Sequence, residues 1–226
     1  MDIKNILLTK LTENNLYPKN SNKIELLVKY IKQLYNWNKK INLISKKNMY
    51  CIIDRHIIDS LQIFNIKDFS HCETMLDIGS GAGLPGIPIY IFSENKKVYL
   101  IESNNKKVSF LNYIKSTLQL NNLFIINKRV EDIKNHNKFM EKFDCVISRA
   151  FSNFKHTLEI SNNFTKYNGY IIYYTTMKQL ISIKQTLSES QFLKYNRFNY
   201  FNYKIGSLDF CIFYVQKLWK TSNIII

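Results

Sequence analysis

The chain has 226 residues, enough for one large domain or for a domain with a small appendage. A formal net charge of +15 favours a polyanionic partner, either a nucleic acid or an anionic membrane surface. The 46% hydrophobic content allows a sizeable core, and the lack of any apolar run of roughly 18 residues argues against a transmembrane helix.

The N-terminal part of the chain is predicted to be helical as far as about residue 70. Apolar side chains recur at helical spacing over 23–35 and again over 55–64. The second stretch contains Arg55, His56 and Asp59, with Asp59 placed four residues after Arg55, where the two side chains are able to form an ion pair on one helix face. Taken alone, this pattern fits a helix-surface ion pair as well as a binding site.

Beyond residue 70 short apolar runs alternate with helical stretches. A helix is expected over Lys106–Leu120, and a Tyr/Phe-rich pair of strands is expected at 198–204 and 210–216, with Gly206 between them. The pattern predicts an α/β fold with a mostly parallel seven-stranded sheet that ends in an antiparallel hairpin. The apolar runs before the hairpin are Met75–Ile78, Val98–Ile101, Leu123–Ile126, Phe143–Ile147 and Tyr170–Tyr174.

The segment Leu76–Gly86 is the strongest candidate site. Four of the six glycines of the chain fall within 79–86, against a composition biased towards Lys, Asn and Ile. A strand is expected to end at Gly79 and a helix to start near Pro88. Glycines remove side chains where a ligand must lie against the backbone, and the helix that follows presents free N–H groups. The candidate binding residues here are Asp77, Gly79, Gly81, Gly83 and Leu84.

The same loop also contains a formal Gly-x-Gly-x-x-Gly pattern at 81, 83 and 86, which would indicate a dinucleotide site. Two residues argue against that alternative. Pro85 lies where a pyrophosphate loop needs an N–H donor, and the carboxylate of Asp77 suits a positively charged ligand better than a pyrophosphate.

Three further segments follow the next strands. Glu102 ends the second strand, where a carboxylate can accept hydrogen bonds from both ribose hydroxyls of a nucleoside. Val130 and Glu131 follow the third strand, where the backbone and one carboxylate could recognise an adenine ring. Ser148-Arg149-Ala150 ends the fourth strand. Because ligands bind at the carboxyl ends of parallel strands, these segments and the glycine loop are expected to share one crevice.

Arginine is rare in this chain, because only four of its 32 basic residues are arginines. Three of them, Arg55, Arg129 and Arg149, lie in the segments singled out above. A guanidinium can hold a phosphate or a guanine edge through two parallel hydrogen bonds, which a lysine cannot do. By contrast, a lysine such as Lys96 is expected at the surface, where exchange for arginine costs little.

The cysteines and histidines form no metal-ligand spacing. The four cysteines contain no Cys-x-x-Cys pair, and the first residues of the chain lack the apolar core of a signal peptide. We therefore expect reduced thiols, a cytoplasmic location and no metal site. The cysteines are Cys51, Cys72, Cys145 and Cys211.

Five motifs together resemble one family, that of RsmG, also called glucose-inhibited division protein B. They are Arg-His-x-x-Asp-Ser-Leu at 55–61, Asp-x-Gly-Ser-Gly-x-Gly-x-Pro-Gly-Ile at 77–87, Glu-x-x-x-Lys-Lys-x-x-Phe-Leu at 102–111, Arg-Val-Glu at 129–131 and Ser-Arg-Ala at 148–150. The resemblance runs from about residue 24 to 176.

The resemblance implies a Rossmann-like class I methyltransferase that methylates N7 of a guanine in 16S rRNA, with S-adenosylmethionine as cofactor. It implies cofactor contacts at Gly79, Leu84, Val130, Glu131 and Arg149. One departure concerns the fifth strand, after which the family usually has Lys-Gly. Here Thr176 and Met177 occupy those positions and the lysine is displaced to Lys178.

Guanine N7 carries a lone pair and no proton, so methyl transfer to it needs positioning rather than a general base. No catalytic base is therefore predicted. Arg149 and His56 are candidates for positioning the substrate, and Arg55 and His56 are expected to contact RNA. The expected partner is 16S rRNA or the small ribosomal subunit, bound by a monomer without membrane contact. The expected division is an N-terminal helical segment over 1–70, packed on a methyltransferase domain over 71–226. The alternatives are an NAD-dependent oxidoreductase and a non-catalytic RNA-binding assembly protein.

Overall fold

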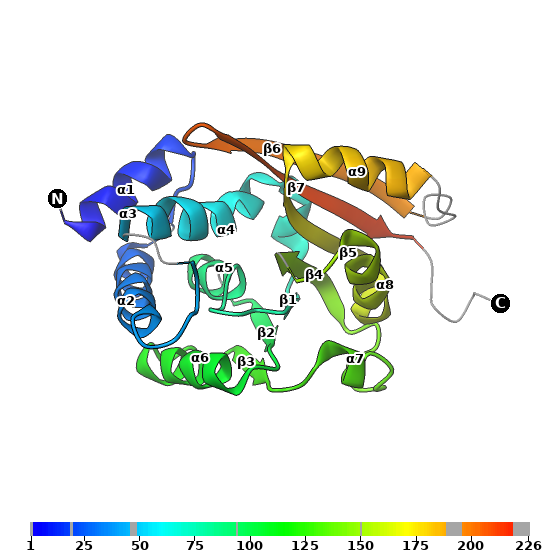
Figure 1. Ribbon diagram of the computed structural model, residues 1–226, viewed down its shortest axis with the longest axis horizontal. Helices are drawn as coiled ribbons and strands as arrows, with labels where there is room; N and C mark the ends of the chain where they lie inside the picture. The colour runs from blue at the N-terminus through cyan, green and yellow to red at the C-terminus, as the bar shows by residue number, and fades with distance from the viewer. Residues whose placement is uncertain are drawn as a thin grey trace.

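The computed structural model describes residues 2–18, 20–45, 49–93, 95–149, 151–188 and 196–218. Ala150, the last residue of the Ser-Arg-Ala motif, lies outside these ranges. Within them the chain forms a central sheet with helices on both of its faces (Figure 1). None of the described helices is both long and apolar enough to cross a membrane.

The sheet has seven strands in the described residues, in the order β3-β2-β1-β4-β5-β7-β6. The first five run parallel, and β7 pairs antiparallel with both β5 and β6. The prediction of a mostly parallel sheet that ends in an antiparallel hairpin is confirmed. The strands are β1 (Thr74–Ile78), β2 (Lys97–Ile101), β3 (Leu123–Ile126), β4 (Phe143–Arg149), β5 (Thr165–Thr176), β6 (Asn196–Ile205) and β7 (Leu208–Lys217).

The chain reverses its direction of travel across the sheet at β1. The strand pairs with β2 on one side and β4 on the other, so the loops that leave β1 and β4 diverge to opposite sides. This is the topological switch point of an open parallel sheet, where ligands bind beyond the carboxyl ends of the strands. Gly79, Glu102 and Arg149 lie at those ends, as the sequence predicts.

The described part of the N-terminal segment is helical, as predicted. One helical stretch of this segment includes a π-helical turn, η1 (Ile53–Ile58), which continues directly into α4 (Asp59–Leu61). Tyr30 of the second helix is fully buried and donates to the carbonyl of Ala82 at 2.8 Å, so this segment contacts the glycine loop directly. The other elements are α1 (Ile3–Glu13), α2 (Ser21–Asn38), α3 (Met49–Ile52), η2 (Gln62–Asn65) and η3 (Lys67–His71).

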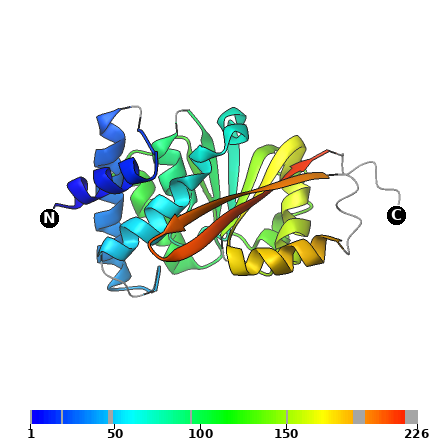
Figure 2. The same cartoon turned by 90° about the horizontal axis from the view of Figure 1, so that it is seen from above.

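Alternating side chains of the strands face two different layers of helices. Met75, Val98 and Cys145 face a core that they share with α5, α6 and the N-terminal helices. Leu76 and Val146 face the opposite core, which α7 and α8 complete. Figure 2 shows the sheet between these two layers. The remaining helices are α5 (Gly86–Phe92), α6 (Asn105–Thr117), α7 (Val130–Ile133), α8 (Phe154–Phe164) and α9 (Met177–Ser188).

Three lysines are structural and do not contribute to a basic surface. The ammonium of Lys23 donates to the carbonyls of Phe92 and Ser93 at the end of α5, and that of Lys217 donates to two carbonyls near the end of α8. Lys96 is only 9% exposed and donates to the carbonyl of Cys72. The expectation of a surface Lys96 is therefore wrong, because its aliphatic stem is buried while its ammonium binds carbonyls at the end of the helical segment 67–71.

Candidate functional site

Of the four glycines in the loop, only Gly81 has open space next to its Cα. Gly81 has a φ of +58°, and a Cβ built there would meet nothing closer than the Gly79 carbonyl at 3.9 Å. At Gly83 the same added atom would lie 2.3 Å from the Ile87 side chain, so that position is closed by packing. A ligand can therefore approach the backbone at Gly81, whereas Gly83 lets the loop sit against its own helix.

Asp77 fixes the end of the glycine loop through a hydrogen bond. Its Oδ2 accepts a hydrogen bond from the backbone N–H of Gly86 at 3.0 Å, which fixes the first turn of α5. The helix therefore begins at Gly86, two residues before the predicted start near Pro88. A Cβ at Gly86 would lie 2.4 Å from the Leu100 side chain of β2, so this glycine lets α5 pack closely against the sheet.

Two buried polar atoms near the loop lack a partner among the described residues. They are Oδ1 of Asp77, at the end of β1, and Oγ of Ser148, near the end of β4. Burial raises the pKa of the Asp77 carboxyl to about 7, although the Gly86 hydrogen bond and the charge of Arg149 oppose that rise. Buried polar groups are normally satisfied, so unsatisfied ones beside an open loop point to a ligand that supplies the missing contacts.

Glu102 connects the second strand to the glycine loop. Its Oε2 accepts from the N–H of Gly81 at 2.9 Å and its Oε1 accepts from the N–H of Asn104 at 2.8 Å. An ionised carboxylate has about four acceptor positions, so room for two further donors remains. Glu102 is 7% exposed and lies at the carboxyl end of β2, as predicted, where a pair of ribose hydroxyls could be bound.

Val130 and Glu131, which follow the third strand, differ in their exposure to solvent. Val130 is 2% exposed and its side chain belongs to the core, so that side chain is not offered to a ligand. The side chain of Glu131 is 44% exposed and lies 3.4 Å from Nε2 of His156. Both residues open α7, beyond the end of β3.

Arg149 lies at the centre of a polar cluster at the end of β4. Its Nη1 donates to Oδ2 of Asp59 at 2.8 Å, and its Nη2 lies 3.1 Å from Nδ1 of His56. A guanidinium only donates, so Nδ1 of His56 accepts this bond. The other carboxylate oxygen of Asp59 accepts from the hydroxyl of Tyr203 at 2.5 Å. The planar fork of Arg149 is therefore held at two of its nitrogens.

This cluster forms one wall of a pocket of about 330 Å³ at the carboxyl ends of β4 and β5. A hollow of this size lies at the lower end of the range typical for small-ligand sites. Its lining comes from the N-terminal helices, β4, β5, α9 and β7, and consists of Arg55, His56, Asp59, Arg149, Tyr173, Tyr174, Thr175, Thr176, Gln179 and Phe210.

The structure corrects the predicted relation between Arg55 and Asp59. Asp59 is 5% exposed and pairs with Arg149, whereas Arg55 is exposed and forms no ion pair with it in the described residues. The π-helical turn over Ile53–Ile58 has hydrogen bonds that span five residues rather than four, so the α-helical spacing assumed for Arg55 and Asp59 does not apply there. Asp59 is thereby turned inward, towards the end of β4.

Sequence reasoning missed the tyrosines of the site. Tyr203 is 144 residues from Asp59 in the chain and comes from the hairpin strand β6, which was predicted only as a strand. Tyr174 of β5 is buried and donates to the carbonyl of Ser60 at 2.8 Å. In a chain with 15 tyrosines, their number gives no signal, and only the fold shows which of them reach the site.

Removing the hydroxyl of Tyr203 is expected to lower the stability of the fold. The Tyr203→Phe change breaks a buried hydrogen bond to the Asp59 carboxylate, and such bonds to charged groups contribute about 1.5–3 kcal/mol. Denaturant unfolding should show a loss of that size. Tyr200→Phe is the matched control, since Tyr200 lies on the same strand with its side chain at the surface, and it should change the unfolding free energy by less than about 0.5 kcal/mol. Equal losses in the two variants would contradict the assigned hydrogen bond.

The raised pKa of Asp77 predicts a defined pH dependence of stability. A carboxyl with a pKa of about 7 in the folded chain binds a proton that the unfolded chain, with an ordinary aspartate pKa near 4, has already lost. The unfolding free energy should therefore fall as the pH rises from about 4 to 7 and then level off, by at most about 4 kcal/mol from this group.

The measurement is denaturant unfolding of the wild type and of Asp77→Asn, from pH 4 to 8. The contribution of Asp77 is the difference between the two curves, and it should be confined to this range. A difference that stays constant with pH would show that Asp77 is ionised throughout and that its pKa is not raised.

Comparison with known proteins gives a consistent result at the level of sequence. A family model described as rRNA small subunit methyltransferase G matches residues 23–210. A ribosomal RNA small subunit methyltransferase G of Clostridium tetani is 38% identical over 151 residues, which is 67% of this chain and 63% of that protein. A protein of the same name from Clostridium botulinum strain Okra is 36% identical over 172 residues, or 76% of this chain and 72% of the relative. The match thus spans less than two thirds of the Clostridium tetani relative.

Comparison with solved structures supports the fold. An O-methyltransferase from Bacillus cereus, solved in complex with SAH, superposes with a TM-score of 0.62 at 14% identity, covering 96% of this chain and 100% of that one. A putative O-methyltransferase from Klebsiella pneumoniae gives a TM-score of 0.60 at 8% identity, with 83% and 89% coverage. At such identities the likeness concerns the fold alone.

Proposed function

The chain belongs to the rRNA small subunit methyltransferase G family, and from this membership we propose that it transfers a methyl group from S-adenosylmethionine to N7 of a guanine in 16S rRNA. The structural observation that carries the proposal is that the open backbone at Gly81 and the Arg149 pocket lie at the carboxyl ends of two neighbouring parallel strands, β1 and β4. One position suits a nucleoside cofactor and the other suits a base.

The residues present fit S-adenosylmethionine. The free space at Gly81 admits a ligand against the backbone, and the unsatisfied Oδ1 of Asp77 and Oγ of Ser148 lie at the ends of the two strands that flank this space. Glu102 has spare acceptor capacity for ribose hydroxyls. When bound, the cofactor supplies a methyl group on a positively charged sulfur, and the ionised form of Asp77 favours such a cation nearby.

The proposed cofactor-binding residues are those that the sequence predicts, and they fall into two groups. Gly81, Glu102 and the backbone of Val130 offer contact surface, whereas Asp77, Gly79, Gly83 and Leu84 also support the shape of the loop. Glu131 and Arg149 complete the proposed set.

We assign the binding and orientation of the guanine to the Arg149 pocket. Guanine N7 already carries the lone pair that forms the new bond, so no side chain has to remove a proton. The pocket has to receive a base taken out of its stack, orient its N7 edge and exclude water. Arg149 is fixed by Asp59 and His56 and can orient a guanine edge or a phosphate, and Arg55 and His56 line the same hollow as proposed RNA contacts. No general base is proposed.

Further proposals concern the state of the protein. Ribosomal RNA as substrate is consistent with a cytoplasmic location, and a monomer bound to 16S rRNA or to the small ribosomal subunit is proposed. The N-terminal helices over 1–70 and the methyltransferase domain over 71–226 are proposed to form one structural unit, supported by the core that they share. Light scattering on the purified protein tests the monomer.

Two experiments test the proposed function. Titration calorimetry with S-adenosylhomocysteine and with NAD should show binding of the first only. Mass spectrometry of 16S rRNA fragments, from cells with and without this gene, should show one N7-methylguanine that depends on the gene. An unchanged set of methylated fragments would reject the proposal.

A further inference from the structure

One half of a sheet face is left open by the described helices. Strand pairing places Tyr170, Gln216 and Arg197 in one row across β5, β7 and β6, and the next row on the same face contains Tyr214 and Asn199. Side chains alternate along a strand, so these five point to the same side. At the other end of this face the side chains pack beneath the N-terminal helices, but these five are half-buried or exposed.

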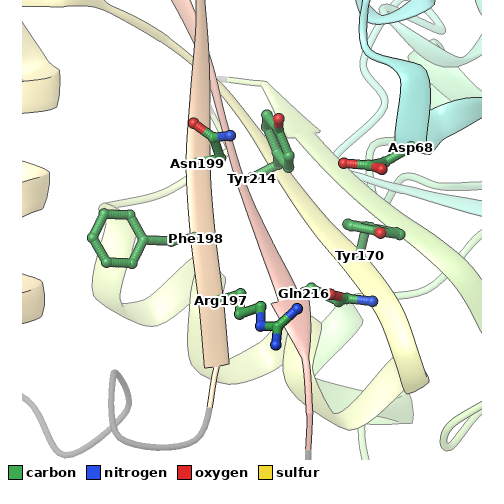
Figure 3. A pocket seen from close by; sticks show the side chains of 7 residues that line it. All are labelled: Asp68, Tyr170, Arg197, Phe198, Asn199, Tyr214 and Gln216. Carbon is green, nitrogen blue, oxygen red and sulfur yellow. The ribbon is translucent and has the colours of Figure 1, made fainter.

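The open half is hollowed and has a distinct chemistry. Figure 3 shows Tyr170 and Tyr214 between Asp68 on one side and Arg197 on the other, while Phe198 points away from them. The hollow measures about 550 Å³. The centroids of the two tyrosine rings lie 6.5 Å apart, and their planes are tilted by 57°. Aromatic surface, amide groups, a cation and a carboxylate are thus presented together.

Arg197 is the one arginine of this chain that lies outside the family motifs. It is exposed, and it lies on β6, the strand from which Tyr203 joins the polar cluster around Arg149. The hollow lies at Tyr170, near the middle of β5, whereas the Arg149 pocket is lined by residues 173–176 at the end of the strand. At about 3.3 Å per residue, these lining residues lie about 10 to 20 Å from Tyr170 along the strand.

We propose that this hollow binds one unpaired nucleotide of the RNA substrate, at a distance from the methylated base. A nucleotide has a flat ring, an anionic phosphate and, on most bases, an edge with N–H donors. Tyr214 and Tyr170 offer surface for the ring, Arg197 offers a two-pronged contact for the phosphate, and Asp68 offers an acceptor for the N–H edge. The inference rests on the proposed function, because it assumes an RNA substrate.

The charges favour this occupant over an anionic membrane or an acidic peptide. A membrane surface would need a cluster of basic and apolar side chains, and the lining has one cation and one carboxylate instead. Overall the chain carries +15, so a polyanion is attracted to it, and the Asp68 carboxylate then selects for a strand that also presents donors. Amide side chains of Asn199 and Gln216 add neutral donors and acceptors.

The test compares Arg197→Gln with Lys204→Gln, an exposed control on the same strand that lies outside the hollow. The first readout is steady-state methylation of 16S rRNA. Arg197→Gln should raise KM for the RNA about 5- to 10-fold with kcat and S-adenosylhomocysteine affinity unchanged, and should lower the slope of log K against log salt by about 0.7. Lys204→Gln should leave KM within about 2-fold of wild type.

The second readout does not depend on methylation. A dodecamer of uridine that carries 4-thiouridine should crosslink to the peptides containing Tyr170 or Tyr214, and Arg197→Gln should reduce that yield. If wild type crosslinks there but never methylates rRNA, the proposed function fails and the nucleotide site stands. Unchanged KM and crosslinking in Arg197→Gln would overturn the inference. So would an effect seen only on assembled subunits and not on naked RNA, since that would indicate contact with a ribosomal protein.

Discussion

Replacing Gly81 with alanine is expected to weaken binding of S-adenosylhomocysteine by about 10- to 100-fold while the protein stays folded. The added methyl group meets no protein atom closer than 3.9 Å, so it enters the space proposed for the cofactor. Forcing a methyl group into an occupied site typically costs about 1–3 kcal/mol, which is the source of the expected range.

Gly206→Ala is a matched control for this change. Gly206 lies in the turn between β6 and β7 with a φ of +61°, close to the +58° of Gly81, and it too has open space around it. Both variants therefore carry the same backbone strain, of about 1–2 kcal/mol. Titration calorimetry together with thermal unfolding separates the effects: both variants should lose similar stability, and only Gly81→Ala should lose affinity. Wild-type affinity in Gly81→Ala would show that the cofactor does not lie against this loop.

Exchanging Arg149 for lysine is expected to reduce the rate of methyl transfer by about 100-fold. Arg149 uses two separate nitrogens, one to Asp59 and one to His56, and a single ammonium on a shorter reach cannot occupy both positions. The positive charge beside buried Asp59 is retained, so the protein should remain folded. Loss of one positioned donor at a reacting site typically costs 10²–10³ in rate.

Single-turnover methylation with saturating rRNA and cofactor measures this effect, and circular dichroism checks the fold. Lys204→Arg is the control, because its side chain is 76% exposed and the exchange should leave the rate within about 2-fold. Equal rates for Arg149→Lys and wild type would mean that charge alone is needed at this position.

The parts of the structure that the sequence predicted depend on local pattern. The apolar runs that become β1 to β5 are continuous because these strands are covered on both faces, and the hairpin is marked by its aromatic residues and Gly206. The glycine loop could be recognised because glycine is scarce elsewhere in the chain. In each case a few neighbouring residues contain the information.

The parts that could not be predicted depend on contacts between distant residues. Arg149 meets Asp59 across 90 positions, and Tyr203 reaches the same carboxylate across 144. Asp59 pairs with Arg149 instead of Arg55, and the π-helical turn that precedes it could not be recognised from the sequence. The sequence predicts Lys96 at the surface because it is a lysine. Its burial depends on a distant backbone carbonyl, that of Cys72, which the sequence does not reveal.

The central claim is that this chain methylates N7 of a guanine in 16S rRNA. The most direct measurement incubates the purified protein with unmethylated 16S rRNA, or with small subunits that carry it, and S-adenosylmethionine with a trideuterated methyl group. Tandem mass spectrometry of nuclease fragments then locates the label. We predict one labelled guanine per rRNA, with the label on N7. No label in the RNA, or label on a ribose, on another base or on another guanine atom, would contradict this account.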